Sequence, residues 1–172
     1  MMKEWFAHTT VPVRIALGVV IVGSLLVLTL TYGVARAPEA YPLAQGESIS
    51  SWNFKGAYQD GGIHEKEARD EIARLKGLID KGDNTYELLV AISSQQLLLG
   101  DGKSAFLYLS KAIELEPKKG LAYFNMGHLL EQLGALESAR AAYTKAVAVE
   151  PTASEYRSYL TVFTSRHPAP QK

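Results

Sequence analysis

Apolar and polar positions follow three different patterns along the chain. Residues 15–35 form an uncharged apolar run, IALGVVIVGSLLVLTLTYGVA, residues 36–62 have no sustained period, and residues 63–167 are typical of helices. A helix of 21 residues is about 30 Å long, which matches the hydrocarbon core of a bilayer. We therefore predict a short N-terminal tail at 1–14, a transmembrane helix at 15–35, a linker at 36–62 and a helical domain.

A cleaved signal peptide is the alternative to an anchor. Ala35-Arg36-Ala37 has the small residues of a cleavage site. However, the apolar run exceeds the roughly 7–15 residues of a signal sequence, and Pro38 fits a peptidase site badly. Arg14 and Arg36 flank the run, where long cationic side chains can reach lipid head groups. These features favour an uncleaved anchor.

Positive charge is slightly more frequent before the apolar run than after it. Lys3, Arg14 and the α-amino group precede the run, whereas Arg36 and the more distant Lys55 follow it. Because cytoplasmic segments carry an excess of Lys and Arg, we expect a cytoplasmic N-terminus. In a bacterial cell this would be a single-pass inner-membrane protein with its helical domain in the periplasm or otherwise outside the cytoplasm.

The linker allows two interpretations. Residues 38–62 read PEAYPLAQGESISSWNFKGAYQDGG and are rich in Pro, Gly, Ser and Gln. One interpretation is an extended tether that lifts the domain off the membrane. The other is that Trp52, Phe54 and Tyr58 dock on a surface, since three large aromatic residues are unusual in a solvated tether. The sequence does not separate docking on the chain itself from docking on a partner.

An internal repeat is the strongest pattern in the chain. Pro117 and Pro151 lie 34 residues apart, and the segments that end at them can be superimposed. The matching positions are Gly100 with Gly134, Ala105 with Ala139, Ala112 with Ala146, Leu115 with Val149, and Glu116-Pro117 with Glu150-Pro151. Small residues at Ser93 and Gly127 would let the first helix of each unit approach the alanines of the second helix closely.

A period of 34 residues with two helices per unit resembles the tetratricopeptide repeat. The unit at 120–153 follows the family pattern at Tyr123, Met126, Gly127, Leu130, Gly134, Ala139, Tyr143, Ala146 and Pro151. The unit at 86–119 follows it at Leu89, Ile92, Ser93, Gly100, Ala105, Leu109, Ala112 and Pro117, and departs from it at Gln96. The resemblance implies an all-α fold, a short solenoid of helical hairpins with flanking capping helices.

Two repeats bury too little surface to be stable alone, so we expect the flanking segments to complete the domain at 63–167. Residues 64–80 place Ala68, Ile72, Leu75 and Ile79 on one helical face. Residues 152–166 predict a capping helix that carries Tyr156, Leu160 and Phe163, and 168–172 form a tail. Asn84 with Glu87, and Thr152 with Glu155, have the spacing of capping boxes.

Composition excludes several classes of function. The chain has 18 basic and 18 acidic residues, which is unlike a nucleic-acid-binding domain, and no cysteine for thiol chemistry. The four histidines are scattered, and no catalytic, phosphate-binding or zinc-binding motif occurs. We expect no enzyme activity, no metal, no cofactor and no small-molecule substrate.

The family resemblance implies that the first helix of each unit lines a concave groove for a protein or peptide partner. The groove positions that carry over are Glu87, Val90, Ser94, Leu97, Leu121, Phe124, Asn125, His128, Glu131 and Gln132. We expect a membrane-anchored scaffold or assembly factor. The alternatives are a periplasmic chaperone-like holdase near the export machinery and a small structural subunit of a membrane complex.

Overall fold

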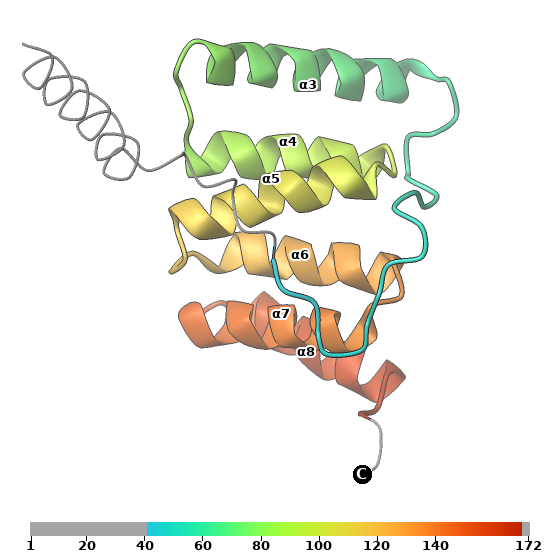
Figure 1. The fold of residues 1–172 in the computed structure, drawn as a ribbon, viewed down its shortest axis with the longest axis vertical. Helices are drawn as coiled ribbons and strands as arrows, with labels where there is room; N and C mark the ends of the chain where they lie inside the picture. The colour runs from blue at the N-terminus through green and yellow to red at the C-terminus, as the bar shows by residue number, and fades with distance from the viewer. Residues whose placement is uncertain (1–40, 170–172) are drawn as a thin grey trace, which may run out of the picture. The chain divides into compact units, whose positions relative to one another are not determined.

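Residues 41–169, the part of the chain that the structure describes, fold into a stack of helices. The structure is a computed structural model, and all described residues belong to one compact unit, Pro38–Lys172. Its helices are α3 (Ile63–Asp80), α4 (Tyr86–Leu98), α5 (Gly102–Leu115), α6 (Gly120–Gln132), α7 (Leu136–Val149) and α8 (Ser154–Arg166) (Figure 1). No strand occurs among these residues, and the predicted all-α fold is confirmed for them.

The predicted transmembrane helix at 15–35 and the tail at 1–14 lie outside the described residues. Between residues 41 and 169, no helix combines the length and the apolar character needed to cross a bilayer. The anchor therefore stays a prediction from the sequence.

Two helical hairpins, α4–α5 and α6–α7, form the centre of the stack. Each first helix is followed by a glycine in the left-handed region, Gly100 with φ 69° and Gly134 with φ 78°. A side chain would be strained there, which explains glycine at both turns. Small residues also allow close packing within a hairpin. A Cβ at Gly127 would lie 2.5 Å from ring atoms of Tyr143, and Ala139 is completely buried.

The flanking helices close both ends of the stack. α3 buries Ala68, Ile72 and Leu75 against Ile92 and Leu99, which form a cluster of their own beside the main core. These three α3 residues belong to the face that helical periodicity predicts. The other positions of α3 are mostly charged and exposed, so the helix ends the solenoid with a polar outer surface.

At the other end, α8 covers the last hairpin with Tyr156 and Phe163. Both side chains are buried, and Phe163 is part of the main core together with residues of both hairpins. Val162, in contrast, is 50 % exposed. One apolar face and one solvated face are typical of a helix that terminates a repeat array.

Both predicted capping boxes differ from the observed helix starts. α4 is capped by Thr85, whose hydroxyl accepts a hydrogen bond from Leu88 N, and not by Asn84. α8 begins after Ala153 with no side-chain cap, so Thr152 does not cap it. A cap must precede the amide that it accepts from by two or three residues. Each helix begins one residue later than the capping box predicts, so the N-cap positions are occupied by Thr85 and Ala153 instead of Asn84 and Thr152.

The linker docks on the helices of its own chain. Residues 41–58, which we call the strap, pack Tyr41, Leu43, Ile49, Trp52 and Phe54 against the main core. The Trp52 ring meets Phe106 of α5 edge-on, with ring centroids 5.1 Å apart. Figure 1 shows the segment crossing α6 and α7 before it rises to α3. The structure therefore shows docking, the second interpretation of the linker, and the surface on which it docks belongs to the same chain.

Serines on the second helix of each hairpin hold the first part of the strap. Tyr41 N donates to Ser110 Oγ of α5 at 3.1 Å, and Ala44 N donates to Ser138 Oγ of α7 at 2.7 Å. The first part of the strap is thus bonded to α5 and α7, the helices that do not contribute the predicted groove residues. Ser110 and Ser138 are both buried.

Three glycines make room for the second part of the strap at the α4–α5 turn. A Cβ on Gly100 would lie 2.1 Å from Phe54 O, and a Cβ on Gly102 would lie 2.4 Å from Trp52 O. A Cβ on Gly56, in the strap itself, would lie 2.3 Å from Leu98 O. Backbone hydrogen bonds join the same segments, including Gly102 N to Trp52 O at 2.9 Å. Backbones can approach this closely only where side chains are absent.

Glu47 of the strap caps the start of α7. Its carboxylate accepts hydrogen bonds from Glu137 N and Ser138 N, each at 2.8 Å, and from the Ser138 hydroxyl. The residue at the helix start, Ala135, has no side chain that could do this. Partial burial raises the pKa of the Glu47 carboxyl, but these hydrogen bonds outweigh it and the pKa is lowered. The strap therefore supplies a cap that the second repeat lacks.

Acidification is expected to weaken this cap. Because the pKa of Glu47 is lower in the folded chain, its carboxylate stabilises the fold above the unfolded pKa of about 4.3. This contribution is lost as the pH falls through the lower folded pKa. We expect Glu47→Gln to cost about 1 kcal/mol at neutral pH and to show a smaller loss of stability on acidification than the parent. Urea denaturation of both proteins at neutral pH and at a pH below the folded pKa of Glu47 measures these losses of stability. Equal losses on acidification in the parent and the variant would contradict the assignment.

Candidate partner-binding groove

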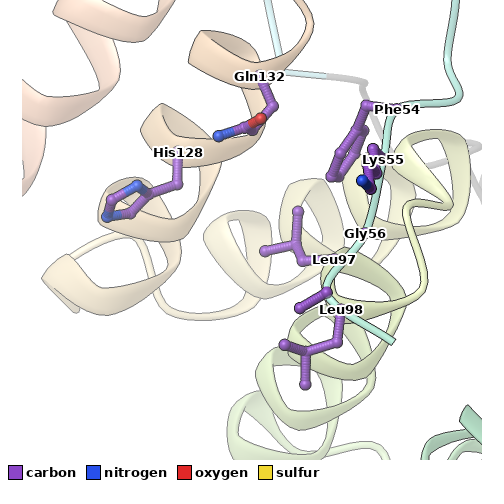
Figure 2. A pocket seen from close by; sticks show the side chains of 8 residues that line it. Phe54, Lys55, Gly56, Leu97, Leu98, His128 and Gln132 are labelled. Carbon is purple, nitrogen blue, oxygen red and sulfur yellow. The ribbon is translucent and has the colours of Figure 1, made fainter. Parts of the chain in front are cut away.

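The first helices α4 and α6 line an open pocket together with the strap. Its volume is about 460 Å³. Figure 2 shows α6 on one side with His128 and Gln132, α4 with Leu97 and Leu98, and the strap opposite α6. Three predicted groove residues, Leu97, His128 and Gln132, thus come together in one place. Leu98 and strap residues 54–57 complete the lining.

The strap wall of this pocket was not predicted from the sequence. Family positions account only for the helical walls, since the strap lies outside the repeats. The aromatic residues of the linker were the available signal, because Phe54 both packs on the core and lines the pocket. At the C-terminal end of α4 the groove is therefore bounded by the strap, which is far from α6 in the sequence.

An aromatic cluster occupies the part of the groove next to α8. Phe124 lies 4.7 Å from Tyr156 and 5.5 Å from Tyr159, measured between ring centroids. His128 lies 4.3 Å from Tyr159 and 5.4 Å from Tyr143. Aromatic contacts of this kind stabilise packed side chains. Phe124 is thus half-buried by α8, which leaves part of its ring for a partner.

The environment of His128 favours the neutral imidazole. Burial among the aromatic rings lowers its pKa, while the nearby Glu131 carboxylate acts in the opposite direction and Arg166 reinforces the lowering. Burial disfavours the charged form of a histidine. A neutral imidazole at the pocket can donate one hydrogen bond and accept another.

Two predicted groove residues are taken up by the fold itself. Val90 is 7 % exposed and belongs to the main core. Glu131 accepts hydrogen bonds from the hydroxyls of Tyr143 at 2.8 Å and Tyr159 at 3.0 Å. Its carboxylate also lies 3.4 Å from Arg166. The side chain is 11 % exposed, so neither residue is available to a partner without disturbing the fold.

The other predicted groove residues lie at accessible or half-buried positions. Ser94 donates its hydroxyl to Val90 O at 3.0 Å. Glu87 forms an exposed ion pair with Lys119 at 2.8 Å. Leu121 is 42 % exposed, and Asn125 is half-buried. These residues lie on the same two helices as the pocket and extend the groove toward the starts of α4 and α6.

The described residues present no metal-binding arrangement. Among residues 41–169, no three His, Asp or Glu side chains are grouped so that they could hold an ion. Glu131 of α6 and His167, which follows α8, lie 3.6 Å apart. This Glu131 carboxylate is already bonded to Tyr143 and Tyr159. The groove therefore offers apolar contact, hydrogen bonds and one flanking ammonium group, Lys55.

Comparison with known families assigns the second hairpin. The model of the tetratricopeptide repeat matches residues 121–152, which cover α6, α7 and the turn between them. The chain contains a tetratricopeptide repeat. The first hairpin of the structure has the same left-handed glycine at its turn, one repeat length earlier. A comparison with curated proteins finds no match for this chain.

Proposed function

We propose that this protein is a membrane-anchored, non-catalytic scaffold or assembly factor that binds a segment of another protein in the groove of α4 and α6. The observation that carries the proposal is the pocket of about 460 Å³ between these helices and the strap. Tetratricopeptide repeats bind proteins or peptides along their first helices, and the repeat at 121–152 supplies one of the two helical walls.

The strap supports this assignment because it leaves the groove accessible. Its first part is bonded to Ser110 and Ser138 on the second helices. Its later residues are bonded to the C-terminal end of α4 and bound the pocket at that end. A bound segment could therefore lie along α4 and α6 without displacing the strap. Recognition of a helix or an extended segment in such an apolar groove is a common mode of peptide binding.

The membrane part of the proposal comes from the sequence. An uncharged run at 15–35 would anchor the chain, with the N-terminus in the cytoplasm and the helical domain on the opposite side. Resistance of the chain to alkaline extraction from membranes tests the anchor. Protease treatment of sealed vesicles tests the side on which residues 41–169 lie.

Photo-crosslinking in native membranes tests the groove. A crosslinking residue at Gln132, which is exposed and lines the pocket, is expected to trap a small set of proteins. The control is Thr144, an exposed position on α7, which should trap none of them. Phe124 is a poorer site because α8 covers part of its ring. Equal adducts from both positions would refute the groove, and many unrelated exported chains would indicate a holdase instead.

A further inference from the structure

We propose that the pocket beside the strap selects a partner segment in which a bulky apolar residue is next to an acidic residue. This inference rests on the proposed function and adds the chemistry of the partner. The apolar side chain would enter between Leu97, Leu98 and Phe54, and the carboxylate would face Lys55. Figure 2 shows these residues around one cavity, with His128 and Gln132 on the opposite wall.

The apolar part of the proposal follows from the lining. Leu97, Leu98 and Phe54 are half-buried, so part of each side chain still contacts solvent. An apolar side chain of a partner would remove this surface from water, at roughly 25 cal/mol per Å² of apolar area. The cavity of about 460 Å³ accepts a side chain as large as leucine or methionine together with backbone.

The charged part follows from Lys55. It is exposed and is the only charged residue among the eight that line the pocket. No ion pair among residues 41–169 involves it. Glu131, a carboxylate on α6, is already bonded to Tyr143 and Tyr159. A carboxylate from a partner would therefore meet an ammonium group without an intramolecular competitor.

The C-terminal end of α4 does not cancel this preference. Helix C-termini carry partial negative charge on carbonyl groups that lack partners. Here each carbonyl from Gln95 to Leu99 accepts a hydrogen bond. The strap supplies one of these hydrogen bonds, from Tyr58 N to Leu98 O at 2.9 Å, and the next residue, Gln59, donates its side-chain amide to Leu99 O. The last carbonyls of α4 thus have partners, and Lys55 lines the same pocket as Leu98.

Selection from a random peptide library by the full-length chain in detergent micelles tests the proposal. The parent is expected to enrich internal sequences with Leu, Ile, Met or Phe next to Asp or Glu. Lys55→Glu should lower the affinity for the enriched peptides about tenfold and shift the enrichment toward peptides with Lys and Arg. The matched control is Lys103→Glu, an exposed lysine on α5 outside the pocket, which should leave the preference unchanged.

Other outcomes would overturn the inference in distinguishable ways. Suppose that the parent binds peptides and that Gln132→Ala abolishes this binding. If the parent then shows no preference for acidic residues, or if Lys55→Glu keeps the same preference, the inference is refuted and the proposed function stands. A preference confined to free peptide C-termini would refute an internal acidic residue. If no peptide is enriched by a folded parent, the proposed function fails together with the inference. Circular dichroism confirms folding of each variant.

Discussion

Replacing Glu131 with alanine is expected to lower the free energy of unfolding by about 3 kcal/mol. Its carboxylate joins three helices, since it lies on α6, accepts hydrogen bonds from Tyr143 of α7 and Tyr159 of α8, and lies 3.4 Å from Arg166. Removing it leaves the buried Tyr143 hydroxyl without its acceptor and the Arg166 guanidinium without its carboxylate. Burial and the contact with Glu131 both raise the pKa of Tyr143 strongly, so this hydroxyl stays protonated and needs an acceptor.

The matched control for Glu131 is Glu87→Ala. Glu87 is also acidic and also occupies a groove position, but its side chain is 70 % exposed and forms only a surface ion pair with Lys119. Such pairs contribute less than about 1 kcal/mol. Urea denaturation followed by circular dichroism compares the two variants. If both lose the same stability, the three-helix network contributes little, and Glu131 would return to the set of residues available for partner binding.

Replacing Gly100 with alanine is expected to cost about 2–4 kcal/mol, clearly more than the same change at Gly134. Both glycines have positive φ, 69° and 78°, so both variants pay about 1–2 kcal/mol for a strained backbone. Only at Gly100 does the new methyl group meet other atoms, 2.1 Å from Phe54 O. Nothing lies within 4 Å of a Cβ at Gly134. The difference between the variants therefore measures the fit of the strap.

Limited proteolysis gives an independent test of this pair. If alanine at position 100 displaces the strap, cleavage within residues 41–58 should become faster, whereas Gly134→Ala should leave the cleavage rate of this segment as in the parent. Trp52 fluorescence should also shift to longer wavelength in Gly100→Ala, because the indole leaves Phe106. Equal stability and equal cleavage in both variants would mean that the strap does not depend on the α4–α5 turn.

The repeat could be recognised from the sequence because its packing is local. Close contacts between the helices of a hairpin require small residues such as Gly127 and Ala139 at fixed spacing, and left-handed turns require glycine at 100 and 134. These requirements recur every 34 residues, so the sequence pattern predicts how the two helices of each hairpin pack. The polar outer faces of α3 and α8 follow in the same way from helical periodicity.

The strap and the final form of the groove could not be predicted in this way. Residues 41–58 have no period, and their partners lie far along the chain, as with Glu47 and Ser138. The role of Gly102 and Gly56 in the packing of the strap can be recognised only in the structure, because a glycine that is needed for a close backbone approach has no distinctive sequence pattern. Glu131 was assigned to the groove by its register in the repeat. Its real environment depends on Tyr159 of α8, a residue that the repeat pattern does not include.

The strap also determines in what order the domain can be completed during synthesis. Solenoids mostly form contacts between neighbours in sequence and can fold as they emerge. Here Ser138 accepts a hydrogen bond from Ala44 N and donates one to the Glu47 carboxylate, which joins residues 94 and 91 positions apart. The first described segment to leave the ribosome must therefore wait for α7 before Ala44 and Glu47 can form their contacts. The opposite wall of the pocket, with His128 and Gln132, lies on α6, which leaves the ribosome only shortly before α7, so the chain would become competent for its partner only near the end of translation.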